Sequence, residues 1–188
     1  NRVTDFYLAD ERHNVLRRAC ESGLAVITPH PAAHARWADK RLLAWLGDDE
    51  LLQQAGLGVD DRSHLRQTIP ATEVVEPAAA DDLWQRRKSL FFKPVDGFGS
   101  KAAYRGDKLT RTTFEQILAH RYVAQALAPT SFRRIQSTDG AEADLRVDVR
   151  NYTMHGATWL RAARLYRGQT TNFRTVGGGF APVLTLPA

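Results

Sequence analysis

The sequence predicts a mixed α/β (α+β) fold, and two observations support this prediction. In the first part of the chain, residues 10–22 and 32–55 carry apolar side chains at helical spacing. From residue 90 onward, short aromatic and β-branched runs are separated by glycine-containing turns, which is the pattern of strands. We therefore expect a helical region followed by a region in which strands dominate.

Two elements are predicted from the start of the chain, after an opening stretch that is typical of a strand edge or a loop. A helix is expected over residues 10–22, with Gly23 as its end. The apolar run LAVITP that follows predicts a short buried strand that ends at Pro29. Cys20 is the only cysteine, which excludes an internal disulfide, and we expect it to be buried as a small hydrophobic residue.

Residues 32–55 have a helical pattern, and Trp37 and Trp45 are expected to belong to the core. The pair Asp48-Asp49 predicts the cap of a new helix within this stretch. Residues 56–80 are looser, because glycines and prolines interrupt them, and they lead into another helix. The elements expected after it are a strand, a glycine turn, a strand, a capped helix and a strand, at residues 90–95, 97–101, 102–106, 110–119 and 121–128.

The last sixty residues predict further strands. Two of them, over residues 145–154 and 159–168, are joined at His155-Gly156. A third is expected through residues 170–175, leading into the glycines at 177–179.

The charge of the chain suits an anionic ligand. The formal net charge is +5 and the pI is near 9.7, but arginines are spread over the whole sequence. Composition therefore does not separate a nucleotide from a nucleic acid as the ligand. Apolar runs are too short to span a membrane, there is no basic segment followed by an apolar one, and we expect a cytoplasmic protein without a membrane partner. Because the chain begins at Asn1 without an initiator Met, we expect a fragment that lacks an N-terminal region.

The segment KPVDGFGSK has the features of a phosphate-binding loop. Gly97 and Gly99 remove side chains that would block a close approach of backbone N–H groups to an anion. Lys93 lies in an apolar strand, where burial without an anionic partner would be costly. The spacing is neither that of a Walker A loop nor that of a Rossmann fingerprint. A β-hairpin with a glycine turn is the structural alternative.

Six segments in the same order resemble the circularly permuted ATP-grasp family, over nearly the whole chain. They are NRVTDFYL, TPHPAAHARWADKRLLAWL, FFKPVDGFGSKAAYRG, RYVAQALA, EADLRVDVRNYTMHG and RAARLYRGQTTNFRTVGGGFAPV. The resemblance implies an ATP-grasp fold in which two lobes clamp ATP and Mg²⁺. Residues 86–127 would form the small lobe, residues 1–85 the permuted connection and part of the larger lobe, and residues 128–188 the strands of the larger lobe.

The activity that this resemblance implies is ATP-dependent ligation of a carboxylate to an amine, either of them a small molecule or a peptide. The carboxylate would be activated as an acyl phosphate, and the protein would position the groups and neutralise charge. Two alternatives stay open: an ATP-grasp module that binds nucleotide without catalysis, and a basic nucleic-acid-binding domain, which the core-like spacing of the aromatic residues disfavours. A missing N-terminal region or a partner protein is expected to complete the substrate pockets.

The resemblance also implies which residues hold the nucleotide. Lys40 and Lys93 match two nucleotide-contacting lysines, although a helix lysine such as Lys40 is also typical of a solvated surface. Gln125 stands in the hinge strand, where the backbone of the next two residues would face adenine. The full expected set is Lys40, Lys93, Gly97, Phe98, Gly99, Ser100, Lys101, Gln125, Ala126, Leu127 and Asp144.

Arg146 and Arg164 are the catalytic residues that the resemblance implies. Asp144 and Arg146 are two residues apart and project from one face of a strand, a spacing that a plain cross-strand ion pair would also explain. Of the two arginines in the next strand, which lie on opposite faces, Arg164 matches the family better than Arg161.

Asp5 and Asn172 are the expected ligands of Mg²⁺, which prefers oxygen donors, although Asn172 is also typical of a turn. The chain departs from the common ATP-grasp pattern because it has no clear E-x-N pair. His30 and His34 are spaced as a metal pair, but they lack a third ligand and do not predict a zinc site.

Overall fold

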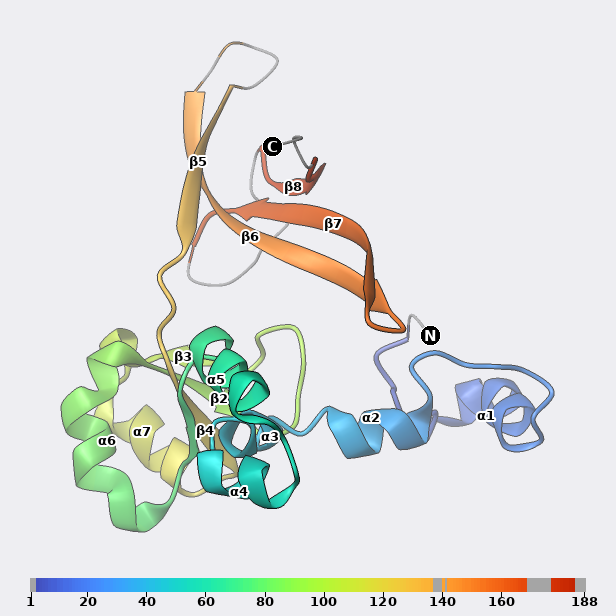
Figure 1. The fold of residues 1–188 in the computed structure, drawn as a ribbon, viewed down its shortest axis with the longest axis horizontal. Coiled ribbons are helices and arrows are strands. Elements are labelled where there is room, and N and C mark those ends of the chain that lie inside the picture. Colours follow the sequence, from blue (N-terminus) through green and yellow to red (C-terminus); the bar gives the residue numbers. More distant parts are fainter. Residues whose placement is uncertain (1–2, 137–139, 141, 169–176, 185–188) are drawn as a thin grey trace. The chain divides into compact units, whose positions relative to one another are not determined.

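The computed structural model describes residues 3–136, 140, 142–168 and 177–184, and the chain divides into two compact units. The first unit is Asn1–Leu127 and the second is Ala128–Ala188. In the described residues each unit contains a four-stranded sheet, and every strand pair is antiparallel (Figure 1). The α+β class is therefore confirmed, whereas the ATP-grasp fold and the predicted lobe boundaries stay predictions.

Short helices fill the first part of the first unit. The helix predicted over residues 10–22 is present, because Asp10 caps a 3₁₀ turn by accepting a hydrogen bond from the Arg12 N–H, and an α-helix follows. Asp48 caps another helix through the Leu51 N–H, as predicted. The elements are η1 (Glu11–His13), α1 (Asn14–Glu21), α2 (Pro31–Trp37), α3 (Leu42–Trp45), α4 (Asp49–Gln54) and α5 (Val59–Thr68).

Two predictions in this region are wrong. The run LAVITP forms no strand, and the side chains of Leu24 and Val26 are 85% and 96% exposed. A strand needs a neighbouring strand for its hydrogen bonds, and no described segment pairs with this run. The looser stretch 56–80 contains helix α5, which sequence patterning missed because few of its residues are apolar.

The tryptophans and the cysteine are also less buried than predicted. Trp37 and Trp45 are exposed, and Cys20 is only half-buried. The short helices α2 and α3 carry no buried residue, so the tryptophans at their ends have no core to enter.

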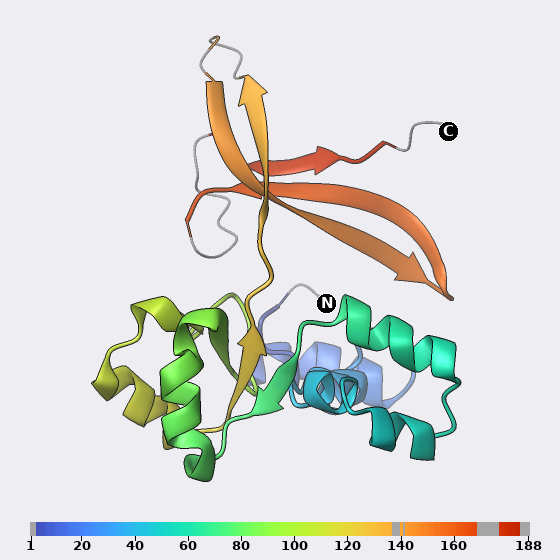
Figure 2. The same ribbon diagram turned by 60° about the vertical axis from the view of Figure 1, so that its left-hand side comes forward.

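The core of the first unit lies between its sheet and two helices. The sheet consists of β1 (Thr72–Val74), β2 (Leu90–Pro94), β3 (Tyr104–Arg105) and β4 (Tyr122–Ala126), in the order β1-β4-β2-β3. Helices α6 (Ala80–Arg86) and α7 (Arg111–Leu118) cover one side of it, and α3–α5 lie on the other (Figure 2). Thr110 caps α7 by accepting a hydrogen bond from the Thr113 N–H. The 3₁₀ turns η2 (Pro77–Ala79), η3 (Arg87–Ser89) and η4 (Gly106–Lys108) connect these elements.

Strand β2 shows how this packing positions a lysine. Side chains alternate along a strand, so Leu90 and Phe92 enter the core beneath α6 and α7. Phe91 and Lys93 project from the opposite face. The hydrophobic core thus holds the strand in register and places Lys93 on the face of the sheet opposite α6 and α7.

The second unit is a sheet of β5 (Ser131–Gln136), β6 (Glu142–Met154), β7 (Ala157–Tyr166) and β8 (Gly179–Pro182), in that order. The two long strands predicted here are confirmed, and they turn at His155-Gly156, where both residues have positive φ. Strand β5 was not predicted. The strand expected through residues 170–175 lies outside the described residues. Among the helices of the described residues, none has the length and apolar character to cross a membrane.

Candidate phosphate-binding site

The glycine loop between β2 and β3 has a backbone that few sequences adopt. Gly97 has φ +127° and Gly99 has φ +64°, and the intervening turn continues with Ser100 and Ala102 at positive φ. A φ near +127° is open essentially to glycine alone. Within the described part of the chain, the N–H groups of residues 97–100 donate no hydrogen bond to protein. These N–H groups are the ones that the sequence predicts to face an anion.

Lys40 is tied to the start of this loop. Its backbone N–H donates to the Val95 carbonyl at 3.2 Å, and its Nζ donates to the carbonyls of Val95 at 3.4 Å and Gly97 at 3.0 Å. Burial lowers the pKa of Lys40 below its ordinary 10.5, and the nearby carboxylates of Asp96 and Asp39 partly offset this effect. The alternative of a solvated helix lysine does not describe its position, because Lys40 is half-buried and precedes α3.

Lys93 meets a neutral partner. Its Nζ donates to Gln125 Oε1 at 2.5 Å, and Gln125 Nε2 donates in turn to Thr72 Oγ1 at 2.8 Å. Gln125 is buried, so these two bonds fix its amide and hold the half-buried lysine on the face of β2 opposite the core. The pKa of Lys93 is lowered by burial and further by the charge of Lys40.

The two lysines therefore form a pair of half-buried cations beside the loop. Among the described residues, no carboxylate oxygen lies within 4.0 Å of either Nζ. Like charges that repel each other in a partly desolvated place cost stability unless a ligand supplies the opposite charge. The third lysine, Lys101, is exposed, with its Nζ 5.2 Å from the centre of the Phe98 ring.

The two backbone N–H groups that the resemblance assigns to adenine binding, at residues 126 and 127, already donate to carbonyls of the protein. The Ala126 N–H donates to the Ala71 carbonyl at 2.7 Å, and the Leu127 N–H donates to the Ser89 carbonyl at 2.9 Å. A contact between these N–H groups and an adenine edge would require both bonds to break. Adenine recognition at residues 125–127 stays a prediction.

Asp5 is held by neighbours in its own segment. Its Oδ2 accepts hydrogen bonds from the Asp10 N–H at 2.9 Å and lies 2.8 Å from His13 Nδ1. These contacts, with the Asp10 N–H as the larger cause, lower the pKa of Asp5 to about 2. Asn172 lies outside the described residues, and the described acidic, histidine and cysteine residues form no group of three suited to a metal ion. The described donors alone do not make the expected magnesium site, and we derive no step through it.

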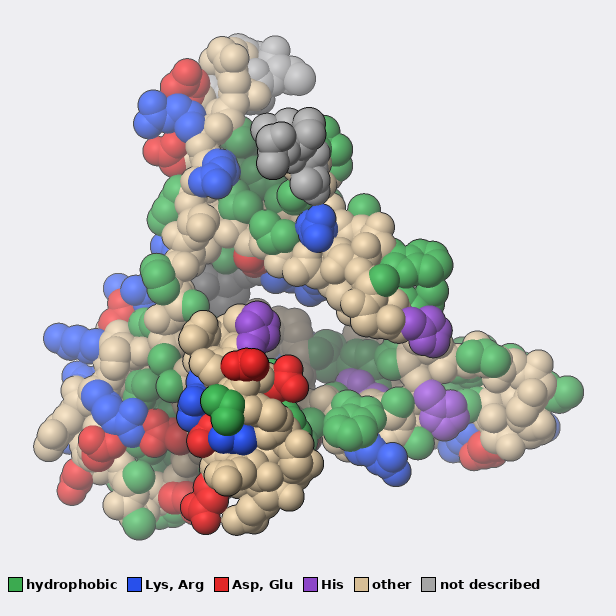
Figure 3. All heavy atoms as spheres, in the orientation of Figure 1, with side chains coloured by type: hydrophobic (Ala, Val, Ile, Leu, Met, Phe, Trp, Pro, Cys, Tyr) green, Lys and Arg blue, Asp and Glu red, His purple; other side chains and the backbone are tan. Residues whose placement is uncertain are grey.

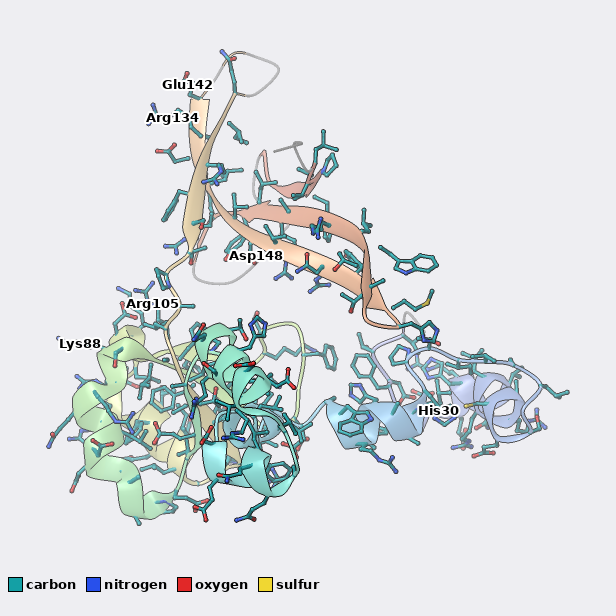
Figure 4. All side chains as sticks on the ribbon, viewed as in Figure 1. His30, Lys88, Arg105, Arg134, Glu142 and Asp148 are labelled. Atoms are coloured by element: carbon teal, nitrogen blue, oxygen red, sulfur yellow. The ribbon has the colours of Figure 1, made fainter. Side chains whose placement is uncertain are left out.

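The predicted residues of the second unit are largely paired with opposite charges. Asp144 lies opposite Arg134, with 3.2 Å between its Oδ1 and the arginine Nε. Asp144 therefore forms a cross-strand ion pair, which is the structural alternative that its spacing allowed. Glu142 approaches the same arginine at 4.0 Å (Figure 4). Figure 3 shows basic and acidic side chains next to one another over the outer end of β5 and β6. Arg146 donates to Thr130 Oγ1 at 3.3 Å, with its guanidinium carbon 5.2 Å from the centre of the Phe132 ring.

Arg164 pairs with a residue that sequence analysis missed. Its Nε donates to Asp148 Oδ1 at 2.5 Å, and the two residues are direct partners in the β6–β7 ladder. Asp148 continues the alternation of Asp144 and Arg146, so it projects from the same face of β6. That alternation was the signal in the sequence that would have found it.

Comparisons with known proteins add no assignment to this geometry. No protein-family model matches the chain, and no curated protein matches it.

Proposed function

We propose that the first unit binds the phosphates of ATP between the glycine loop and the lysine pair, as part of an ATP-dependent ligase of the ATP-grasp type. One observation carries the proposal: Lys40 and Lys93 are half-buried, repel each other and have no carboxylate within 4.0 Å in the described residues. A triphosphate supplies the negative charge that Lys93 lacks, and it adds to the effect that the more distant Asp39 and Asp96 have on Lys40.

The loop supports the same ligand. Its N–H groups at residues 97–100 have no acceptor in the described chain, and backbone N–H groups gathered at positive φ make a concave site for an anion. Charge-assisted hydrogen bonds from lysine and N–H groups to phosphate oxygens are roughly twice as strong as neutral ones. A sugar or an apolar ligand would leave the positive charge of the lysines without a counter-charge.

In the ligation that we propose, a carboxylate oxygen attacks the γ-phosphorus of ATP, and the bond to the β–γ bridging oxygen breaks, releasing ADP. An amine then attacks the acyl phosphate carbon, phosphate leaves, and the amine loses a proton. Lys40 and Lys93 would hold and neutralise the phosphates during the first step. Arg146 and Arg164 remain the proposed catalytic arginines, with Arg164 oriented by Asp148.

The proposal is tested by thermal unfolding of the whole chain with Mg-ATP. We expect ATP to raise the melting temperature of the wild type, and we expect Lys93→Met to abolish this rise, because it removes the charge and keeps the apolar stem. Lys88→Met is the matched control: it removes the same charge from the exposed turn η3 (Figure 4). No ATP-induced shift in the wild type, or equal shifts in both variants, would overturn the proposal.

A binding module without catalysis is the second candidate, and the second unit favours it. Asp144 and Arg164 each have an opposite charge as partner, so neither shows the unmet charge that marks the lysine pair. Release of ADP from Mg-ATP, dependent on both a carboxylate and an amine, would identify the ligase. ATP binding without ADP release under the same conditions would identify the module.

A further inference from the structure

A cavity of about 180 Å³ lies in the first unit beside the glycine loop. Three segments line it: the N-terminal stretch, the end of α2 with the residues that follow, and the start of the loop. The lining residues are Thr4, Asp5, Phe6, Tyr7, His34, Ala35, Ala38, Asp39, Asp96, Gly97 and Phe98. The cavity shares Gly97 with the proposed phosphate site, since Lys40 Nζ donates to the Gly97 carbonyl.

Aromatic rings form a connected wall of this cavity. The rings of Phe6 and His34 are stacked with their centres 4.1 Å apart, and Phe98 meets Phe6 edge-on at 5.2 Å. Tyr7 meets His34 edge-on at 5.5 Å. Because each ring contacts another, the wall has a defined shape, and aromatic faces attract cations.

The charged groups of the lining are all carboxylates: Asp5, Asp39 and Asp96. A hydrogen bond from Arg41 lowers the pKa of Asp39, and backbone and His13 hydrogen bonds lower that of Asp5, so both are ionised at neutral pH. The cationic groups that interact with these carboxylates stand outside the lining: His13, Lys40, Arg41 and Arg121. The surface that a ligand meets is therefore aromatic and acidic.

We infer that this cavity binds the ammonium or guanidinium group of a cationic substrate, and that it anchors the amine partner of the ligation. Only the second statement, that the bound cation belongs to the amine partner of the ligation, rests on the proposed function. Each carboxylate already has a cationic partner outside the lining, but the lining itself carries no lysine or arginine, so its carboxylates and aromatic rings favour a cation over an anion or an uncharged group. The amine that reacts must be unprotonated, so the anchored group is a second, charged nitrogen of the same molecule. ATP at the neighbouring site neutralises Lys40 and thereby removes a repulsion on this cation.

The test is a titration of the whole chain with propylammonium, propylguanidinium, propionate and n-propanol, followed by ¹H–¹⁵N shifts. We expect the two cations to bind and to shift residues 4–7 and 96–98, while propionate and propanol leave them unchanged. Asp96→Asn should weaken cation binding at least threefold, and Asp81→Asn, the same change at an exposed site on α6, should not. Equal binding of propionate, or equal effects of the two variants, would overturn the inference.

Two further variants separate this site from the phosphate site. Phe98→Leu removes a ring of the wall with little change in volume, and we expect it to weaken cation binding without unfolding the protein. Lys93→Met should leave cation binding within twofold of the wild type while ATP binding is lost. Cation binding without ATP binding would overturn the proposed ligase and keep the cavity, and ATP binding without cation binding would do the reverse.

Discussion

The lysine pair of the first unit and the arginines on the strands of the second unit differ in the partners that they contact. In the first unit, Lys40 contacts the Gly97 carbonyl and Lys93 contacts the Gln125 amide, and the charge of Lys40 lowers the pKa of Lys93. In the second, Arg134 and Arg164 lie against aspartates on neighbouring strands. A paired cation is explained by its partner, whereas a half-buried cation such as Lys93, whose contact is a neutral amide and whose charged neighbour is another lysine, favours an anionic ligand. This difference places the stronger evidence for a site in the first unit.

Gly97→Ala should have the largest effect of the remaining predictions. A Cβ at φ +127° costs on the order of 1–3 kcal/mol, which shifts the loop and weakens ATP binding by about tenfold or more. Gly58→Ala is the control, because Gly58 has φ −64° and an added Cβ meets only Asp61 Oδ2 at 4.0 Å. Calorimetric titration with Mg-ATP measures both. Unchanged affinity in Gly97→Ala would show that the loop backbone does not hold phosphate.

ATP affinity should also depend on pH in a window that ends below the ordinary lysine pKa of 10.5. Burial lowers the pKa of both lysines, so they lose their protons as pH rises over a range that lies below 10.5. Affinity is then highest near neutrality and falls on the way to pH 10.5, with proton uptake on binding in that range. The free protein changes in the opposite sense, because its unfolded state binds more protons there and its stability rises with pH.

Titrations between pH 7 and 10 in buffers of different ionisation enthalpy measure both the affinity and the proton uptake. The Lys40→Met, Lys93→Met double variant serves as the control, since it has neither titrating group. An affinity that stays constant over this range would contradict a role for the lysine charges.

The smallest effect is expected in the second unit. Arg164 and Asp148 are mostly buried side chains in an ion pair, and a double-mutant cycle with Arg164→Met and Asp148→Leu should give a coupling of about 1 kcal/mol in stability. ATP affinity should stay within twofold of the wild type in both variants. If either variant lost as much ATP affinity as Lys93→Met, the second unit would be part of the phosphate site. The contrast between the lysine pair and the arginines of the second unit would then be wrong.

Local signals in the sequence determined several elements of this protein. Thr110 marks the start of α7 because a threonine side chain caps a helix, and the apolar, aromatic run of residues 90–95 predicts the strand β2 that carries Lys93. Glycines at 97 and 99 predict the unusual loop between β2 and β3. Each of these features depends on residues that are close together in the chain.

Tertiary structure decided what local signals left undetermined. The run 24–29 has the composition of a strand but lies exposed, since only a neighbouring strand would have stabilised it there. The two tryptophans at the ends of α2 and α3 found no core to enter. Asp148 became the partner of Arg164 through the register of β6 and β7.

The lysine pair shows the same division most clearly. The apolar strand around Lys93 predicts an anionic partner for it, and the resemblance to ATP-grasp proteins implies the same for Lys40. The contact of Lys40 with Gly97 and that of Lys93 with Gln125, however, join residues far apart in sequence. The aromatic and acidic cavity likewise assembles from three separate segments. The sequence determines which side chains are able to bind a charged group, and the packing of the core determines which of them meet. Bringing distant segments together costs chain entropy, and the burial of apolar side chains offsets this cost.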